Sequence, residues 1–421
     1  MKLVSPVSLA LALALGSVAV MAPQSAMAAK KEKPAKASKA ADPVLSKEFR
    51  AAIGPAQQAA QKKDFATAEA GLAVAAPLAK LPDELFFLGS VSYEIAAAKN
   101  DTAGMRKGID MMIDSGSKMP TNLDKLNQAS GQAAYQAGDY QKAIARLAEA
   151  DRLGSKDVNR LLLAAEANFK LTQIAPGLDL LSRAIEEQKA SGQAVAEDWF
   201  RRGLSMALRS KQSSLISTWS HKLVRNNPSA TNWRDALIIY RDSAKLDSKS
   251  QMDIARLMFD TKSLTGERDF NDYAALALEG KLPWEAEQSI QAGLDSGAVV
   301  KTSKAVQERL AEAKAMGPAE SAALATDQKK ALTTGTAVYA LNVANALLSQ
   351  GSNDKALELL AVAEKRGADA ASVNMLRGMA LTRLGRKAEA TAAFKAITTA
   401  PKSEIASFWM LFLELGGAKA G

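Results

Sequence analysis

The chain has 421 residues, with 54 lysines and arginines against 45 aspartates and glutamates, and a formal net charge of +9. It contains no cysteine and a single histidine, which excludes thiol catalysis, disulfide bonds, cysteine-ligated metals and histidine metal clusters. β-Branched runs with period-two alternation are missing, while Ala, Leu, Lys, Glu and Gln dominate, and this composition favours an all-α fold.

Residues 1–28 have the features of a secretory signal peptide. Lys2 supplies the positive start, residues 7–22 form an apolar run rich in Leu and Ala, and residues 26–28 (Ala-Met-Ala) present small side chains to a signal peptidase. We expect cleavage after Ala28 and export of a bacterial protein to the periplasm, with secretion as the second choice. The alternative is an uncleaved inner-membrane anchor, although the run is shorter than the roughly 20 residues that span a bilayer. No later segment is apolar and long enough to cross a membrane.

Residues 29–44 form a linker rich in lysine and alanine, which is expected to be disordered because residues 29–42 offer no large apolar side chain. Its simplest role is that of a solubilising spacer. A weak contact with anionic envelope surfaces, at very roughly 1 kcal/mol per lysine, is the functional alternative. Lys2 supplies one of the nine net charges and residues 29–41 supply four, so only about four remain for the rest of the chain. A nucleic-acid partner is therefore not predicted.

Two stretches near the end of the chain repeat each other at an interval of 34 residues. They read ANALLSQGSNDKALELLAVAEKRGA and GMALTRLGRKAEATAAFKAITTAP. Each begins with a small residue, reaches Gly351 or Gly385, and then places Ala356 or Ala390 at the same point. The two glycines are expected to end helices in the left-handed conformation, as is Gly138 upstream. A fixed interval of this length is typical of stacked helical hairpins, in which each unit buries its apolar face against its neighbours.

The same pattern recurs earlier in the chain. The segment GQAAYQAGDYQKAIARLAEA places Ala143 twelve residues after Gly131, with Leu147 one turn later, and Gly177 follows Ala143 by another 34 residues. Residues 61–75 form a further copy. Together these residues resemble tetratricopeptide (TPR) repeats. The three copies that match best are Gly131–Ala150, Ala344–Ala363 and Gly378–Ile397.

The resemblance implies an all-α, right-handed superhelical solenoid of about ten to eleven helical hairpins. The array is expected to occupy residues 45–402. Regions 84–115, 230–263 and 301–333 lack the full motif and are expected to contribute ordinary helical pairs. The apolar helix expected at 403–416 either caps the last hairpin or presents its apolar residues to a partner, and packing is the preferred interpretation.

In TPR proteins the first helix of each hairpin lines an inner, concave wall, where peptides or partner helices bind. The set of Lys, Asn and Arg with which some TPR proteins grip a C-terminal carboxylate is not reproduced here. We therefore expect a longer segment or a folded surface, held by amide hydrogen bonds and aromatic or methionine contacts. The resemblance assigns the following positions to the groove: Gln128, Gln132, Tyr135, Gln136, Leu162, Glu166, Phe169, Lys170, Leu341, Asn345, Met375, Met379 and Arg383.

No catalytic, cofactor or metal site is predicted. His221 precedes a helix end and is interpreted as structural, and carboxylates such as Asp253 and Asp260 stand at ordinary exposed helix spacing. The hypothesis is a non-catalytic periplasmic scaffold or adaptor that binds an envelope protein or peptide. The alternative is a helical protein that binds or processes cell-wall glycan, for which a carboxylate pair would be needed. The sequence is silent on the oligomeric state.

Overall fold

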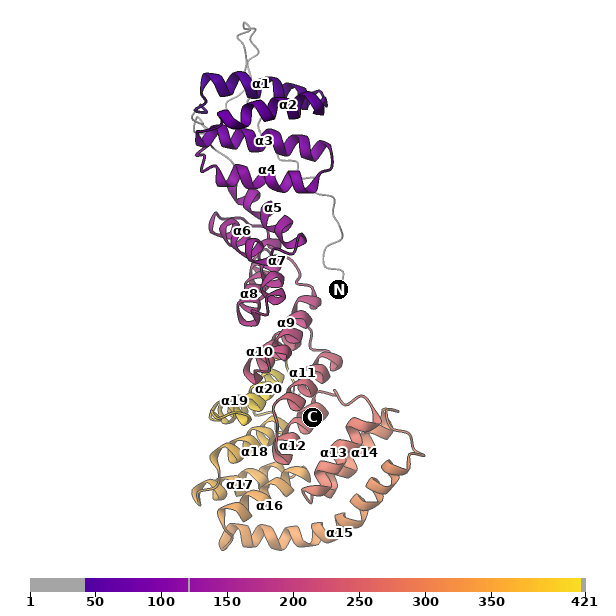
Figure 1. Cartoon of the computed structure of the whole chain (residues 1–421). Coiled ribbons are helices and arrows are strands. Elements are labelled where there is room, and N and C mark those ends of the chain that lie inside the picture. Colours follow the sequence, from indigo (N-terminus) through magenta and orange to yellow (C-terminus); the bar gives the residue numbers. More distant parts are fainter. Residues whose placement is uncertain (1–41, 120–121, 418–421) are drawn as a thin grey trace, which may run out of the picture. The chain divides into compact units, whose positions relative to one another are not determined.

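The computed structural model describes residues 42–119 and 122–417 (Figure 1). The described residues form 20 α-helices and one 3-10 helix, with no strand among them, so the predicted all-α fold is confirmed. Two compact units divide the chain, Met1–Gln193 and Ala194–Gly421. The predicted signal peptide and nearly all of the predicted linker lie outside the described residues.

The first unit consists of helices that pair with their neighbours in chain order, α1 with α2, α3 with α4, α5 with α6 and α7 with α8 (Figure 1). This is the hairpin arrangement that the repeat interval predicts. The elements are α1 (Lys47–Gln61), α2 (Phe65–Ala75), η1 (Ala76–Leu78), α3 (Pro82–Ala98), α4 (Thr102–Asp114), α5 (Leu123–Gln136), α6 (Tyr140–Arg152), α7 (Asn159–Lys170) and α8 (Ile174–Ala190).

The second unit continues with helical pairs but contains one element that the sequence did not predict. Residues 301–333 were expected to form a helical pair, and this prediction is wrong: α15 is one helix of 30 residues that continues through Pro318. The other elements are α9 (Glu197–Ser210), α10 (Ser213–Asn226), α11 (Ala230–Ser243), α12 (Ser248–Asp260), α13 (Glu267–Glu279), α14 (Pro283–Asp295), α15 (Lys304–Thr333), α16 (Ala337–Ser349), α17 (Asn353–Lys365), α18 (Ala370–Arg383), α19 (Lys387–Lys395) and α20 (Lys402–Glu414).

The turns between paired helices contain a residue in the left-handed conformation. Gly138, Gly351 and Gly385 have φ angles of 80°, 85° and 71°, which confirms the left-handed helix ends predicted for them. Asp139 follows one of these turns, and its side chain accepts a hydrogen bond of 3.1 Å from the backbone N–H of Lys142, which starts the next helix. Other glycines are left-handed too, and among the described residues seven left-handed positions carry side chains: Lys63, Asn100, Thr172, Lys211, Lys245, Lys262 and Lys281.

Small residues let the paired helices approach closely, as the repeat pattern predicts. A Cβ atom added at Gly131 would lie 2.6 Å from Cγ of Leu147, and one added at Gly378 would lie 2.4 Å from Cε1 of Phe394. The larger residue of each pair therefore occupies the space that the glycine leaves open.

The backbones of α3 and α4 approach each other closely. A Cβ atom on Gly108 would lie 2.8 Å from the backbone nitrogen of Tyr93 and 2.9 Å from the carbonyl oxygen of Gly89. Because backbone atoms cannot rotate away, Gly108→Ala should destabilise the first unit by about 1–3 kcal/mol. The matched control is Gly54→Ala in α1, where an added Cβ meets nothing within 4 Å. That variant should be stabilised by about 0.5–1 kcal/mol.

The measurement is amide hydrogen exchange of the full chain, read over α3 and α4. Gly108→Ala should speed exchange there and leave tryptophan fluorescence unchanged, because all five tryptophans lie in the second unit. Equal exchange protection in the two glycine variants would contradict the close approach of the two helices.

Helix α20 buries its apolar side within the second unit. Phe408 and Trp409 are both 0% exposed. Phe408 stacks on the ring of His221 in α10, with 4.2 Å between centroids, and Trp409 stacks on Phe394 in α19 at 5.8 Å. Figure 1 shows α20 beside α10 and α19. The apolar residues at 403–416 therefore contact the protein's own helices.

Polar contacts also join α20 to helices that lie far back in the chain. The hydroxyl of Tyr240 in α11 donates a hydrogen bond of 2.7 Å to Glu404, and Arg225 in α10 forms an ion pair of 2.8 Å with Glu414. Helix α12 also contacts α20. The second unit is thus closed: its last helix packs against α10, α11 and α12.

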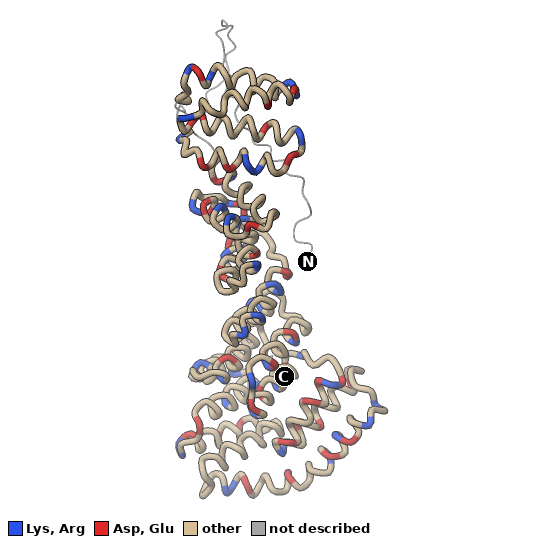
Figure 2. The backbone as a smooth tube through the Cα atoms, in the orientation of Figure 1, with Lys and Arg blue, Asp and Glu red and all other residues tan. Residues whose placement is uncertain are grey.

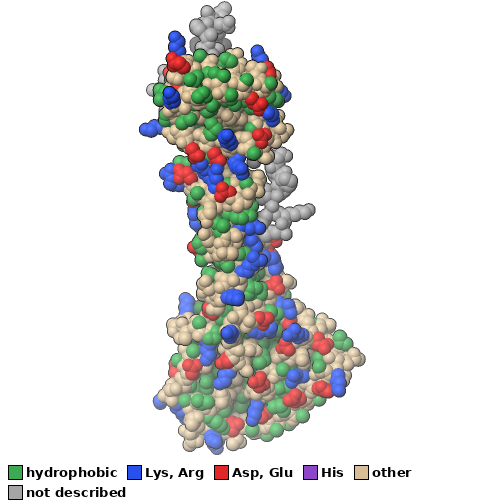
Figure 3. All heavy atoms as spheres, viewed as in Figure 1, with side chains coloured by type: hydrophobic (Ala, Val, Ile, Leu, Met, Phe, Trp, Pro, Cys, Tyr) green, Lys and Arg blue, Asp and Glu red, His purple; other side chains and the backbone are tan. Residues whose placement is uncertain are grey.

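The surface carries charges of both signs and scattered apolar side chains. Figure 2 shows acidic and basic residues interspersed along both units, and Figure 3 shows hydrophobic side chains between them on one face. None of the helices in the described part of the chain is both long and apolar enough to cross a membrane.

Candidate functional site

In the first unit, the predicted groove positions lie on the first helices of two successive hairpins. Gln128, Gln132, Tyr135 and Gln136 belong to α5, whereas Leu162, Glu166, Phe169 and Lys170 belong to α7. The two helices contact each other.

Their exposure differs. Gln136 and Lys170 are exposed, and Gln128 accepts a hydrogen bond of 2.9 Å from the Ser155 hydroxyl. Phe169 is only 6% exposed and fills the space above Gly177 of α8, which places it between the helices of its own hairpin.

In the second unit, three predicted groove positions line one cavity. Leu341 and Asn345 come from α16, and Met375 comes from α18. Arg383 is half-buried and lies 3.8 Å from Glu285 without lining the cavity, whereas Met379 is 0% exposed and belongs to the core. The repeat interval thus brings side chains that are 30 residues and more apart in the sequence to one place.

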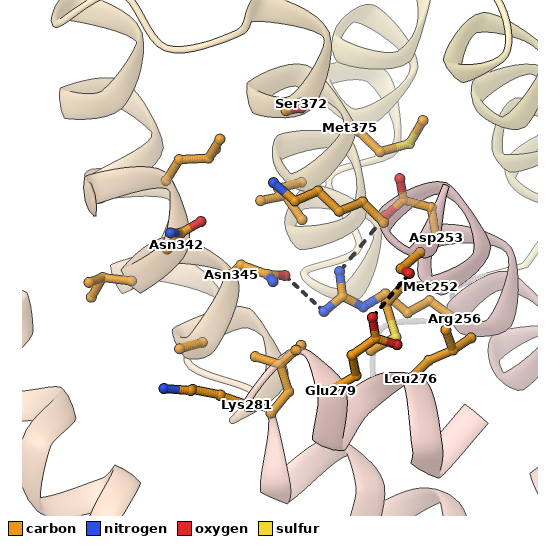
Figure 4. Close-up of a pocket in the computed structure, with 18 of the residues that line it drawn as sticks. Met252, Asp253, Arg256, Leu276, Glu279, Lys281, Asn342, Asn345, Ser372 and Met375 are labelled. Carbon is orange, nitrogen blue, oxygen red and sulfur yellow. Dashed lines mark hydrogen bonds and ion pairs between the residues drawn. The ribbon is translucent and has the colours of Figure 1, made fainter. Parts of the chain in front are cut away.

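The cavity has a volume of about 530 Å³ and is walled by residues of α12, α13, α14, α15, α16, α18 and α20 and of the turn after α13 (Figure 4). Its apolar wall includes Met252, Leu276, Trp284, Tyr339, Leu341 and Met375. Its polar wall includes Asp253, Arg256, Lys281, Asn342, Asn345 and Lys402.

A buried ion pair includes Arg256, which lines the cavity, and Glu285, which does not. Arg256 and Glu285 are each 1% exposed, and their two hydrogen bonds are both 2.8 Å long. Arg256 also donates a hydrogen bond of 2.8 Å to Asn345, which Figure 4 shows, and the hydroxyl of Tyr273 donates a hydrogen bond of 2.7 Å to Glu285. Burial raises the pKa of Glu285, but Arg256, Arg383 and the Tyr273 hydroxyl outweigh it and hold the pKa below its usual range. The pair is therefore charged and holds α12 against α14 and α16.

Asp253 stands one turn before Arg256 on α12 and has a different environment. It is 7% exposed, and burial raises its pKa from 3.8 to about 7, although the charges of Arg256 and Lys402 act in the opposite direction. The nearest cationic nitrogen, Nη1 of Arg256, is 4.0 Å from its carboxylate. Among the described residues no group donates a hydrogen bond to this carboxylate. Asp253 is thus a buried acid that lines a cavity, with Arg256 as an ion-pair partner at 4.0 Å but without a hydrogen-bonded partner among the described residues.

These burials correct the sequence analysis, which placed Asp253 and Asp260 at exposed helix positions. Asp253 is buried, whereas Asp260 is half-buried with a buried Oδ2 atom, and burial raises the pKa of Asp260 as well. The reason is the closed second unit, because α12 contacts α11, α13 and α20 and has little surface left. A signal was present in the sequence. Ile254, Leu257 and Met258 stand between the charged residues, so apolar side chains are found on more than one face of α12, and such a helix is commonly buried.

Asp253→Asn should stabilise the protein at high pH. The folded-state pKa lies above the unfolded value of 3.8, so the acid form is favoured by folding and stability is lost as the pH rises from about 4 to above 7. Removing the buried charge should raise the free energy of unfolding by about 1–3 kcal/mol at pH 8 and by less at pH 5.

Urea unfolding followed by tryptophan fluorescence at the two pH values measures this difference. Glu358→Gln, at an exposed position of α17, is the control and should change nothing at either pH. A loss of stability in Asp253→Asn at pH 8 would show that the carboxylate has a stabilising partner.

His221 lies between two helices and not in the cavity. Its Nδ1 is 2.6 Å from the carbonyl oxygen of Ser217, and its Nε2 is 3.1 Å from the hydroxyl of Ser407 in α20. Burial lowers its pKa. These contacts are those of a packing residue, and in the described ranges no group of three or more acidic or histidine side chains could hold a metal ion.

No protein-family model matches this sequence, and no curated protein matches it. Among solved structures, the chain is similar to a tetratricopeptide repeat protein from Parabacteroides merdae, with 13% identity, a TM-score of 0.30, and coverage of 78% of this chain and 99% of that one. It is also similar to the TPR domain of P58(IPK), with 11% identity, a TM-score of 0.26, and coverage of 80% and 99%. A third is the TPR2AB domain of yeast Sti1 in complex with pHSP90, with 15% identity, a TM-score of 0.24, and coverage of 69% and 98%. The 34-residue copies and the successive helical pairs show that the chain is a TPR-like array of helical hairpins.

Proposed function

We propose that this protein is a non-catalytic scaffold that binds a peptide segment of a partner protein in the cavity of its second unit. The observation that carries the proposal is the position of Leu341, Asn345 and Met375. The repeat pattern assigns all three to partner contact, and all three line the same cavity of about 530 Å³. Ligand pockets commonly have volumes of about 300–1,000 Å³.

The chemistry of the wall suits a peptide. Met252 and Met375 offer flexible thioether side chains that adapt to differently shaped apolar groups. Asn342 is exposed at the cavity, where its side-chain amide can exchange hydrogen bonds with a peptide backbone. The cavity therefore combines an adaptable apolar wall with amide groups, which is the combination expected from the sequence.

Site-specific photo-crosslinking in native envelopes tests this function. A benzoylphenylalanine residue at position 342 faces the cavity, and the same residue at position 358 on α17 is an exposed control outside it. We expect a protein to be captured from position 342 only. Capture of the same proteins from both positions, or of none, would contradict the proposal. Co-sedimentation with purified cell-wall sacculi would instead support the glycan alternative.

The predicted signal peptide determines the compartment in which we expect the protein to meet its partner. The features of residues 1–28 support cleavage after Ala28 and a periplasmic protein, with an envelope protein as partner. Mass spectrometry of the native protein's N-terminus is the test, and we expect the mature chain to begin at Ala29. An intact Met1 in the membrane fraction would support the anchored alternative.

A further inference from the structure

We propose that Asp253 receives the ammonium or guanidinium group of a lysine or arginine side chain on the bound segment. This inference rests on the proposed function and adds to it the chemical class of the side chain that enters the cavity. It begins with a carboxylate that is 7% exposed, lines the cavity, and lacks a hydrogen-bond donor among the described residues.

The cations nearest to Asp253 are already engaged by other carboxylates. Arg256 directs two hydrogen bonds of 2.8 Å to Glu285 and stays 4.0 Å from Asp253. Lys402, also at the cavity, forms an ion pair of 2.9 Å with Asp369. Figure 4 shows Asp253 and Arg256 projecting from α12 into the same space. The floor therefore has one acidic group whose charge no neighbour neutralises through a direct hydrogen bond.

The rim does not change this balance. Lys249 and Lys281 are exposed lysines at the cavity, and Glu279, Glu320 and Asp327 are acidic residues there. The rim therefore has no excess of positive charge that could neutralise Asp253. The carboxylate of Asp253 lies at the floor, where low solvent exposure strengthens its interaction with an incoming cation.

The walls beside Asp253 suit the stem of a long basic side chain. Met252, Met375 and Leu376 line the cavity with apolar groups. Lysine and arginine bury their methylene stems along such surfaces and place the charge at the far end. An apolar wall that leads to a carboxylate therefore fits a basic side chain better than an apolar or an acidic one. A charge-assisted hydrogen bond should add about tenfold or more in affinity over an uncharged side chain of the same length.

The test uses the full chain and four labelled, blocked peptides of sequence Leu-Ala-X-Ala-Leu, in which X is lysine, arginine, norleucine or glutamate. Norleucine keeps the stem of lysine and lacks its charge. Fluorescence polarisation should rank lysine and arginine about tenfold above norleucine, with glutamate weakest. Asp253→Asn should reduce the lysine peptide to the affinity of the norleucine peptide and leave the latter unchanged, whereas Glu358→Gln should alter neither.

The outcomes separate the two proposals. If the lysine and norleucine peptides bind equally well to the unaltered protein, the role of Asp253 is wrong and the peptide-binding function stands. If no peptide binds and position 342 captures no protein, the function itself fails, and the inference fails with it. The comparison of peptides on the unaltered protein does not depend on how any variant folds.

Discussion

Replacing Glu285 with glutamine should lower the free energy of unfolding by about 3–5 kcal/mol, because the substitution removes the carboxylate that is hydrogen-bonded to the buried guanidinium group of Arg256 and leaves Asp253, 4.0 Å away, as a weaker ion-pair partner. Arg256 is 1% exposed, so water cannot take over that role. The half-buried Arg383, whose Nη2 lies 3.8 Å from Glu285, would lose the same anion. The effect should be concentrated in the second unit, where both helices of the pair lie.

Tryptophan fluorescence is a selective reporter for this measurement, since all five tryptophans belong to the second unit. Urea unfolding of Glu285→Gln should show a lower midpoint. The control is Glu389→Gln, which removes an exposed ion pair with Arg386 and should cost less than about 1 kcal/mol. The double variant Arg256→Met with Glu285→Met should recover part of the lost stability, because it removes the buried guanidinium group together with its hydrogen-bonded carboxylate. A double variant as unstable as Glu285→Gln would contradict this explanation.

Trp409→Ala should cost about 3–5 kcal/mol, the range observed when a large aromatic core residue is truncated. The indole is 0% exposed and packs on Phe394 and Phe412, with centroid separations of 5.8 and 6.1 Å. Within the described part of the chain its Nε1 has no hydrogen-bond partner. The loss should therefore come from packing alone, and Trp409→Phe should be much milder than Trp409→Ala.

The remaining four tryptophans report the unfolding of the second unit in this variant. Hydrogen exchange in α1 to α8 should stay unchanged. Glu414→Ala is the matched control on the same helix, because it removes only an exposed ion pair with Arg225. If Trp409→Ala behaves like Glu414→Ala, the C-terminal helix does not stabilise the second unit.

The helix ends show what a single sequence can and cannot predict. Gly138, Gly351 and Gly385 were predicted to be left-handed because glycine adopts that conformation at no steric cost. Lys63 and Lys281 adopt the same conformation, with φ angles of 60° and 57°. Lysine has no such preference, so only the packing of the two helices imposes the turn there. Hairpins whose turns lack glycine are therefore hard to recognise from the sequence, although the structure shows the same left-handed turn in them.

The residues of the candidate site also include some that could be predicted from the sequence and some that could not. Leu341, Asn345 and Met375 follow the repeat interval, so their position on the inner helices could be inferred before their shared cavity was known. The apolar residues around Asp253 indicate a buried helix, but the cavity that Asp253 lines could not be predicted, because it depends on α12 lying inside a closed unit. That closure is made by α20, whose partners in α10 and α11 lie more than 150 positions earlier. No local periodicity contains that information.

The two units differ in how far their contacts reach along the chain. In the first unit the hydrogen bond from Val44 to Asp83 joins residues 39 positions apart, whereas in the second unit Ser213 and Glu404 are 191 positions apart. Ordering a loop of that length delays folding. During synthesis, α1 to α8 can assemble as they leave the ribosome, but the second unit must wait for its final residues. A premature stop codon a few residues before Lys402 would therefore remove little of the polypeptide. It would nevertheless remove α20, the helix that closes the second unit, and that unit makes up more than half of the chain.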